Sequence, residues 1–365
     1  MWRIIKRLEI GGPLAAAVAA LVGVGLLTRS EDIAQGVAQG LRISGQVLIP
    51  ALFPFMALCS YIILTDAARI LSIPLRPLTK YVFRLPPEHG AVALMSLVGG
   101  YPAGGKMISG LLEQGRLDTL TAERMLGFCY GPSPAFLITA VGAGMLFDRR
   151  AGIILFCAQM IAAVLVGFIL SLKTPWPAGK PSGPRIKGGA GAFVSAVTSA
   201  SSTMLNLCAF AVFFSGLLYL MKGSGAAEWL GTLLHLEPYF AGALIAGFFE
   251  VTSGGVYASG LGGERAILLI SLFCSWGGLS SVFQVISFFG KTKLRLKIFF
   301  MGRILHVFFA AAISLILYRF FFADMPAMFI GVQPVMGQNG RSWLSALCFL
   351  AMITMLTMKP RHLDR

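Results

Sequence analysis

Lys106 and Glu250 are charged side chains close to glycine pairs inside apolar stretches, where a charge is costly and usually has a function. Lys106 directly follows Gly104-Gly105, and Glu250 lies in Gly-Phe-Phe-Glu-Val-Thr-Ser-Gly. An ammonium group beside broken helix ends would attract a carboxylate. Glu250, with the hydroxyls of Thr252 and Ser253, is suited to binding a solute, a coupling proton or Na⁺. Two structural alternatives stay open: Lys106 reaches the aqueous face, and Glu250 accepts hydrogen bonds from freed backbone N–H groups.

Glycine and proline interrupt the apolar stretches close to these two residues. Backbone groups freed by such breaks cannot be satisfied by lipid, so broken helices face protein or a watery cavity and offer partial charges to a solute. The alternative is that the glycines only allow close helix packing. The other candidate solute-binding residues are Gly99, Gly100, Tyr101, Pro102, Gly104, Gly105, Ser133, Gly254, Gly277, Gly278, Ser280, Ser281 and Gln284.

Several chemistries are excluded by residue type and spacing. Residues 100–106 match G-x-x-x-x-G-K, but Met107 follows where a P-loop needs Ser or Thr, and no strand precedes the motif. The six cysteines form no CxxC pair and the four histidines are scattered, so we expect neither a disulfide framework nor a metal site. Because no acid–base or nucleophile set is present, we expect no enzyme and no cofactor beyond a coupling proton or Na⁺.

The composition predicts an all-α integral membrane protein. Of 365 residues, 56% are hydrophobic and only 12% are charged, whereas soluble proteins are about a quarter charged. The apolar residues form runs such as 151–172, 266–290 and 298–318, and about 20 apolar residues cross a bilayer. The net charge of +15 lies mostly in short segments between these runs, which indicates contact with the lipid bilayer and not with nucleic acid.

We predict eight transmembrane helices and two re-entrant hairpins. The spans are 13–27, 43–64, 125–147, 151–172, 191–221, 265–290, 297–320 and 343–358, and the hairpins are 90–112 and 238–263. With both termini in the cytoplasm, inside segments carry 21 of the 30 Lys and Arg residues and outside segments carry eight. This count places Arg303 in an inside segment, and the asymmetry follows the positive-inside rule.

An internal duplication divides the chain. Residues 94–106 align with 244–256, residues 127–134 with 272–279, and residues 47–55 more weakly with 204–212. We therefore predict an N-terminal helix and loop at 1–42, a first repeat at 43–172, a Pro/Gly-rich cytoplasmic linker at 173–190, a second, inverted repeat at 191–322, and a C-terminal helix with a basic tail at 323–365. Paired broken segments in two such halves point to the binding site of a transporter.

These motifs resemble a known family. Leu-Phe-Pro-Phe at 52–55, Gly-Gly-Tyr-Pro-Ala-Gly-Gly-Lys at 99–106, Phe-Cys-Tyr-Gly-Pro-Ser-Pro at 128–134, Phe-Glu-Val-Thr-Ser at 249–253 and Gly-Gly-Leu-Ser at 277–280 are similar to the YlbJ-type sporulation integral membrane proteins. That type belongs to the nucleoside-recognition, or Gate-domain, superfamily. The chain departs from the pattern at Cys129-Tyr130-Gly131, where polar residues are expected.

The resemblance implies a function that the residues alone do not. It implies transport of dipicolinate, a small aromatic dicarboxylate, across the outer forespore membrane during sporulation. The alternatives are a carrier of a nucleoside-like solute and a non-transporting assembly factor of the spore envelope. A homo-oligomer stays open as well.

Overall fold

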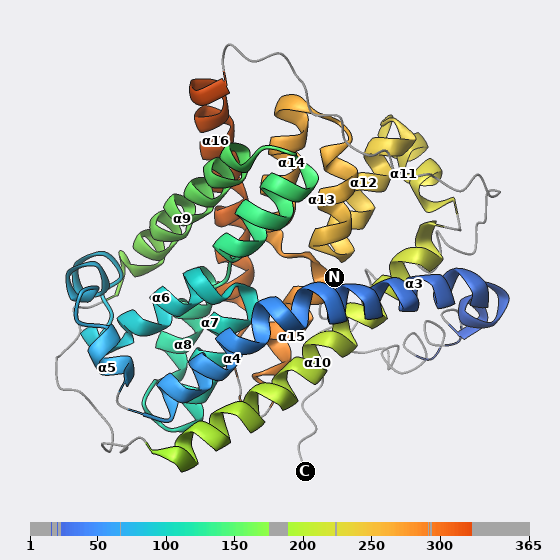
Figure 1. Ribbon diagram of the computed structural model, residues 1–365. Helices are drawn as coiled ribbons and strands as arrows, with labels where there is room; N and C mark the ends of the chain where they lie inside the picture. Colours follow the sequence, from blue (N-terminus) through green and yellow to red (C-terminus); the bar gives the residue numbers. More distant parts are fainter. Residues whose placement is uncertain are drawn as a thin grey trace, which may run out of the picture.

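The computed structural model consists of helices throughout the part of the chain that it describes, with no strand there (Figure 1). It describes residues 16, 20, 23–65, 67–174, 189–222, 225–290, 292 and 294–322. The elements of the first half are α3 (Ser30–Ile43), η1 (Ser44–Leu48), α4 (Ile49–Ile63), α5 (Ala67–Leu71), η2 (Leu78–Val82), η3 (Pro87–His89), α6 (Gly90–Gly99), α7 (Tyr101–Glu113), α8 (Thr119–Phe128), η4 (Ala135–Met145) and α9 (Arg149–Ser171). Those of the second half are α10 (Ala190–Lys222), α11 (Ala226–Leu234), α12 (Pro238–Phe249), α13 (Val251–Ser259), α14 (Gly263–Trp276), α15 (Gly278–Ser287) and α16 (Lys297–Phe322).

The prediction of an all-α membrane protein is confirmed. Four helices are long and apolar enough to cross a bilayer, namely α9, α10, α14 with α15, and α16. They coincide with the predicted spans at 151–172, 191–221, 265–290 and 297–320. If the pair α11 and α12, which is bent by 112°, counts as one span, the described residues contain five such spans. The total of eight stays a prediction, because the spans at 343–358 and most of 13–27, like most of the linker, lie outside the described residues.

The remaining predicted segments differ in detail from single helices. The span at 125–147 consists of α8 and the π-helix η4, separated by residues 129–134. The span at 43–64 continues backward through η1 into α3, which the sequence prediction treated as a loop. The sequence prediction missed helix α3 because its apolar residues lie on one side only. Packing on α10 stabilises this segment as a helix.

Each predicted hairpin is a pair of helices joined at one residue. Gly100, with φ of 79°, separates α6 from α7. Glu250, in an extended conformation, separates α12 from α13. The left-handed φ at Gly100 suits glycine, whereas the extended backbone at Glu250 suits any residue.

The helices that match between the two halves run antiparallel. Arg150, at the start of α9, stacks on the ring of Phe322, at the end of α16, at 5.3 Å. Helices α3 and α4 lie along α10 in the same opposed sense, because Gly36 faces Ser215 and Gly40 faces Val212 (Figure 1). An inverted duplication requires this antiparallel pairing.

Gly40 tests the packing of α3 on α10. A Cβ there would lie 2.7 Å from the Val212 Cα, so Gly40→Leu must separate the helices. We expect it to cost about 1–3 kcal/mol and to lower the melting temperature of the detergent-purified protein. The control is Gly45→Leu, at a position with no atom within 4 Å of the added Cβ. Equal melting temperatures for the two variants would contradict this packing.

Candidate functional site

The hairpin break in each half touches the broken span of the same half. A Cβ at Gly100 would lie 3.4 Å from the Ser133 backbone nitrogen, between α8 and η4. In the second half, a Cβ at Gly278 would lie 3.1 Å from the Glu250 Cα. The structure therefore brings together the two segments of each half that the sequence marked as broken.

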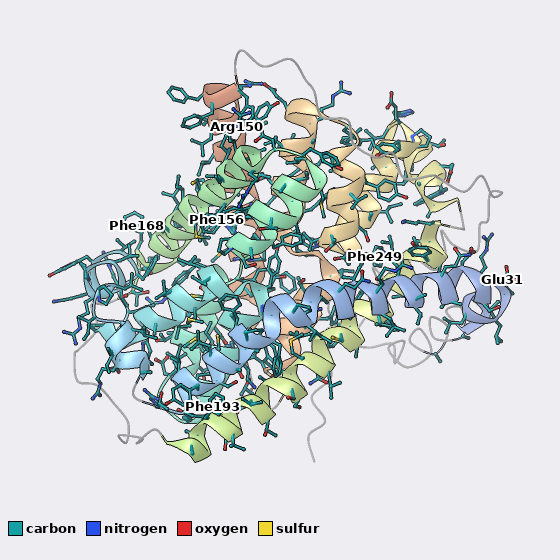
Figure 2. The ribbon with its side chains drawn as sticks, viewed as in Figure 1. Glu31, Arg150, Phe156, Phe168, Phe193 and Phe249 are labelled. Atoms are coloured by element: carbon teal, nitrogen blue, oxygen red, sulfur yellow. The ribbon has the colours of Figure 1, made fainter. Side chains whose placement is uncertain are left out.

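Glu250 caps the helix that follows it. Its carboxylate accepts hydrogen bonds from the N–H groups of Thr252 (2.8 Å) and Ser253 (2.6 Å), at the N-terminus of α13. The preceding Phe249, labelled in Figure 2, packs against Phe214 of α10 with ring centroids 6.4 Å apart. The side chain of Glu250 is buried, at 8% exposure. The structural role that the sequence left open for Glu250 is thus present.

The helix N-termini at the breaks differ in whether a side chain accepts a hydrogen bond from their free backbone N–H groups. Glu250 caps α13, and the hydroxyl of Ser133 accepts the Phe136 N–H in the first turn of η4 (3.2 Å). No side chain caps α7 after Gly100 or α15 after Gly277. At its breaks, each half therefore has one N-terminus with a side-chain cap and one open N-terminus without. In α7 the open end offers few free N–H groups, because Pro102 has none and Ala103 donates to the Gly100 carbonyl (3.0 Å). The open ends carry the partial positive charge that attracts anions.

Two tyrosines connect the break regions of the two halves. The Tyr101 hydroxyl donates to the Cys274 carbonyl (2.7 Å), near the end of α14. The Tyr130 ring lies 4.9 Å from that of Tyr101, and its hydroxyl lies directly against Gly277. That hydroxyl is buried without a hydrogen-bond partner. A buried donor of this kind, beside an open helix N-terminus, is suited to a ligand oxygen.

Arg303 of α16 holds the C-terminal ends of both broken spans. Its guanidinium donates to the carbonyls of Gly127 (2.7 Å) and Tyr130 (2.6 Å) at the end of α8, and to the Ser275 carbonyl (3.3 Å) near the end of α14. It also stacks on the Tyr130 ring at 4.7 Å. Arg303 is fully buried, at 0% exposure. A cation here satisfies carbonyls that have no helical partner and offsets the negative ends of two helix dipoles.

A polar chain continues from Arg303 into α9. Arg303 lies 3.0 Å from His306 Nδ1, and His306 Nε2 lies 3.1 Å from the Gln159 carbonyl. The Gln159 amide donates to the Ser271 carbonyl (3.2 Å) and the Ser275 hydroxyl (3.0 Å) of α14. His306 and Gln159 therefore join the two antiparallel helices α16 and α9 directly, and Gln159 connects them to the end of α14.

Some predicted site residues lie away from the breaks. Lys106 is half-buried and donates to the Ser199 hydroxyl of α10 at 3.0 Å, so it contacts neither open helix end. Gln284 donates to the Leu207 carbonyl and to Ser280, which is a packing role, while Ser281 is partly exposed on α15. Close helix packing also accounts for three of the glycines: Gly104 lies against Cys129, Gly105 against Val285, and Gly254 against Gly247. The remaining predicted residues, Gly99 and Pro102, are buried at the ends of α6 and α7 that flank Gly100.

Arg303 corrects one sequence-based assignment. The charge count placed it in a cytoplasmic segment, but it is a buried residue of α16. A signal was present, because Arg303 lies alone within the run 298–318 and such residues mark functional interiors. His306, in the same run, carried a signal of the same kind. For Tyr130 and Gln159 no comparable signal existed, since aromatic and neutral polar residues are common in membrane proteins. The described part of the chain holds no group of three His, Cys, Asp or Glu residues that could bind a metal.

Replacing Arg303 should destabilise the protein strongly. Arg303→Met would leave the Gly127 and Tyr130 carbonyls buried without a donor, and each hydrogen bond to a charged group contributes about 1.5–3 kcal/mol. We expect a loss of about 3 kcal/mol or more, measured as a large fall in melting temperature in detergent. Arg319→Met is the control, because Arg319 pairs with Glu264 at the surface (2.8 Å) and exposed pairs contribute little. Similar falls in both variants would contradict the role given to Arg303.

Comparison with known proteins gives one curated relative. The chain is 26% identical to the sporulation integral membrane protein YlbJ of Bacillus subtilis (strain 168) over 310 residues, which cover 77% of this chain and 76% of that protein. No protein-family model matches the chain, and no solved structure matches it. The resemblance to YlbJ-type proteins that the motifs predicted is confirmed, whereas membership of the wider Gate-domain superfamily stays a prediction.

Proposed function

We propose that this multi-pass membrane protein is a secondary transporter of a small anionic solute, working by alternating access around its helix breaks. The observation that carries the proposal is the pair of open N-termini, of α7 and α15. These two helices pack on each other, and their starting points are connected by Tyr101 and Tyr130. Uncapped N-termini beside a buried unpartnered hydroxyl are suited to oxyanions.

Charge near the open ends favours co-transport of a cation. Gly278 lies directly against the backbone of Glu250, so an anion at the start of α15 would lie within one side-chain length of the Glu250 carboxylate. Repulsion between like charges in a buried site is large. A proton or Na⁺ that binds with the solute would remove it, and Glu250 is the group that would receive that cation.

Dipicolinate is the solute we propose. It has two carboxylates for the two open helix ends and an aromatic ring that matches the tyrosines between them. The similarity to a protein named for sporulation supports this choice, and it would place the protein in the outer forespore membrane with both termini in the cytoplasm. A nucleoside-like solute and an assembly role in the spore envelope are the alternatives that the test must separate.

Uptake into proteoliposomes tests the function. The purified protein would be reconstituted and given labelled dipicolinate, with uridine and unrelated dicarboxylates as competitors. We expect saturable uptake that dicarboxylates inhibit and uridine does not. Flux of uridine alone would show that the protein is a transporter of a nucleoside-like solute and not of dipicolinate. Absence of any flux from folded protein would favour the assembly role.

Gly277 tests whether the open end of α15 is part of the site. Gly277→Ala places a Cβ against the Tyr130 hydroxyl, so we expect loss of uptake. The matched control is Gly115→Ala, at another glycine with a left-handed backbone (φ 66°) but with no atom within 4 Å of the added Cβ. Both variants bear a backbone strain of about 1–2 kcal/mol. If Gly115→Ala loses as much uptake as Gly277→Ala, the assignment of α15 is wrong.

Glu250→Gln tests coupling. Gln retains one acceptor for the α13 cap but cannot bind a proton or balance Na⁺. We expect uptake that no longer depends on a proton or Na⁺ gradient, or no uptake at all. If Glu250 acts only as a helix cap, Glu250→Gln should lower the melting temperature by the equivalent of about 1 kcal/mol and leave the gradient dependence of uptake unchanged.

A further inference from the structure

A second group of charged side chains lies apart from the helix breaks, where the first hairpin begins. It consists of His89, at the end of η3, Arg124 of α8, and the two arginines of the adjoining loops, Arg84 and Arg116. Arg124 donates to the Arg84 carbonyl through Nη2 (3.2 Å). Our topology places this group at the cytoplasmic face.

Arg124 carries a buried positive charge that the described residues do not pair. Its side chain is 7% exposed, and its Nε and Nη1 atoms have no hydrogen-bond partner. None of the ion pairs in the described part of the chain includes it. An uncompensated buried charge costs several kcal/mol, so the arrangement favours any anion that can reach these nitrogens.

The neighbouring groups leave this position positive. Arg84 donates to the carbonyls of Leu172 and Thr174 (both 2.9 Å), and Arg116 donates to the Ile63 carbonyl (3.3 Å). Both arginines donate to neutral backbone carbonyls, so these contacts do not compensate the positive charge of the group. Among the described carboxylates, Asp118 accepts the Thr121 N–H at the start of α8 (2.9 Å) and Glu123 accepts the Arg295 N–H (2.6 Å), and neither makes an ion pair with Arg124.

His89 adds an acceptor beside these donors. Burial lowers the pKa of His89 to about 4; the guanidinium groups of Arg116 and Arg124 act in the same direction, against a hydrogen bond to the Arg116 backbone and the charge of Asp118. The ring is therefore neutral at physiological pH. Its Nδ1 atom is buried without a partner. A neutral imidazole that carries its proton on Nε2 has Nδ1 as an acceptor.

We propose that Arg124 and His89 form a binding site for a phosphate group, distinct from the site at the helix breaks. A monoprotonated phosphate matches the set, since its oxygens accept from Arg124 and its hydroxyl donates to His89 Nδ1. Arg84 and Arg116 are partly exposed, so the site adjoins the surface. The phosphate belongs either to a free ion or phosphomonoester, or to the headgroup of phosphatidylglycerol, a phosphodiester in which a glycerol hydroxyl takes the place of the phosphate hydroxyl as the donor to His89.

Phosphate-dependent stabilisation tests this site. The melting temperature of the full-length protein in detergent would be measured against inorganic phosphate, with chloride at equal ionic strength as the reference. A parallel series would add phosphatidylglycerol or phosphatidylcholine to the micelles. We expect a saturable rise with phosphate or with phosphatidylglycerol. A rise with phosphatidylglycerol alone identifies a lipid headgroup, whereas a rise with phosphate identifies a free ion. No saturable rise with either probe overturns the proposal.

Two variants locate the effect. Arg124→Gln should weaken the response about tenfold or more, the equivalent of one charge-assisted hydrogen bond. His89→Phe provides a second variant, which keeps the ring and removes the acceptor, should Arg124→Gln not fold. Arg76→Gln is the control: it removes the same charge from an exposed residue of the same predicted face. A response as strong in Arg124→Gln and His89→Phe as in Arg76→Gln would show that the phosphate binds elsewhere.

Discussion

The contact on which this structure depends is the guanidinium of Arg303 with the carbonyls of Gly127, Tyr130 and Ser275. A helix that breaks inside a membrane leaves carbonyls that neither lipid nor the helix itself can satisfy. Two spans of this protein break in that way, and one arginine from a third helix serves both. Because Arg303 also contacts His306, and through it Gln159, the same contact joins α16 to α9. The breaks are stable because α16 supplies the missing donor.

The two halves share their order of elements but not their chemistry. Where the second hairpin has Glu250 at its turn, the first has Gly100. The first half instead supplies a hydroxyl at its broken span, from Ser133. The corresponding broken span of the second half, at Gly277, has no capping hydroxyl. Capped and open helix ends therefore alternate between the halves. The two halves thus present similar backbone at their breaks, with a carboxylate at the break of the second half and none at that of the first.

Helix packing and helix breaks use different members of the same glycine-rich motifs. Gly104 and Gly254 allow helices to approach within contact of backbone atoms, as small residues do in membrane proteins. Gly100 and Gly277 adopt left-handed conformations that end one helix and begin the next. Lys106, five residues into α7, contacts Ser199 of α10.

The sequence by itself determined that the chain crosses a membrane, where its long apolar helices run, and that each hairpin breaks within a glycine-rich stretch. It placed the breaks at the Gly-Gly pairs 104–105 and 254–255, whereas the structure has them four residues earlier, at Gly100 and Glu250. Those features follow from local properties, namely the length of apolar runs and the conformations open to glycine and proline. Only the tertiary structure decided that Arg303 is buried, that Tyr130 faces Gly277, and that Glu250 caps α13 while α7 and α15 stay open. Most of these depend on contacts between residues more than a hundred positions apart, which no local pattern encodes.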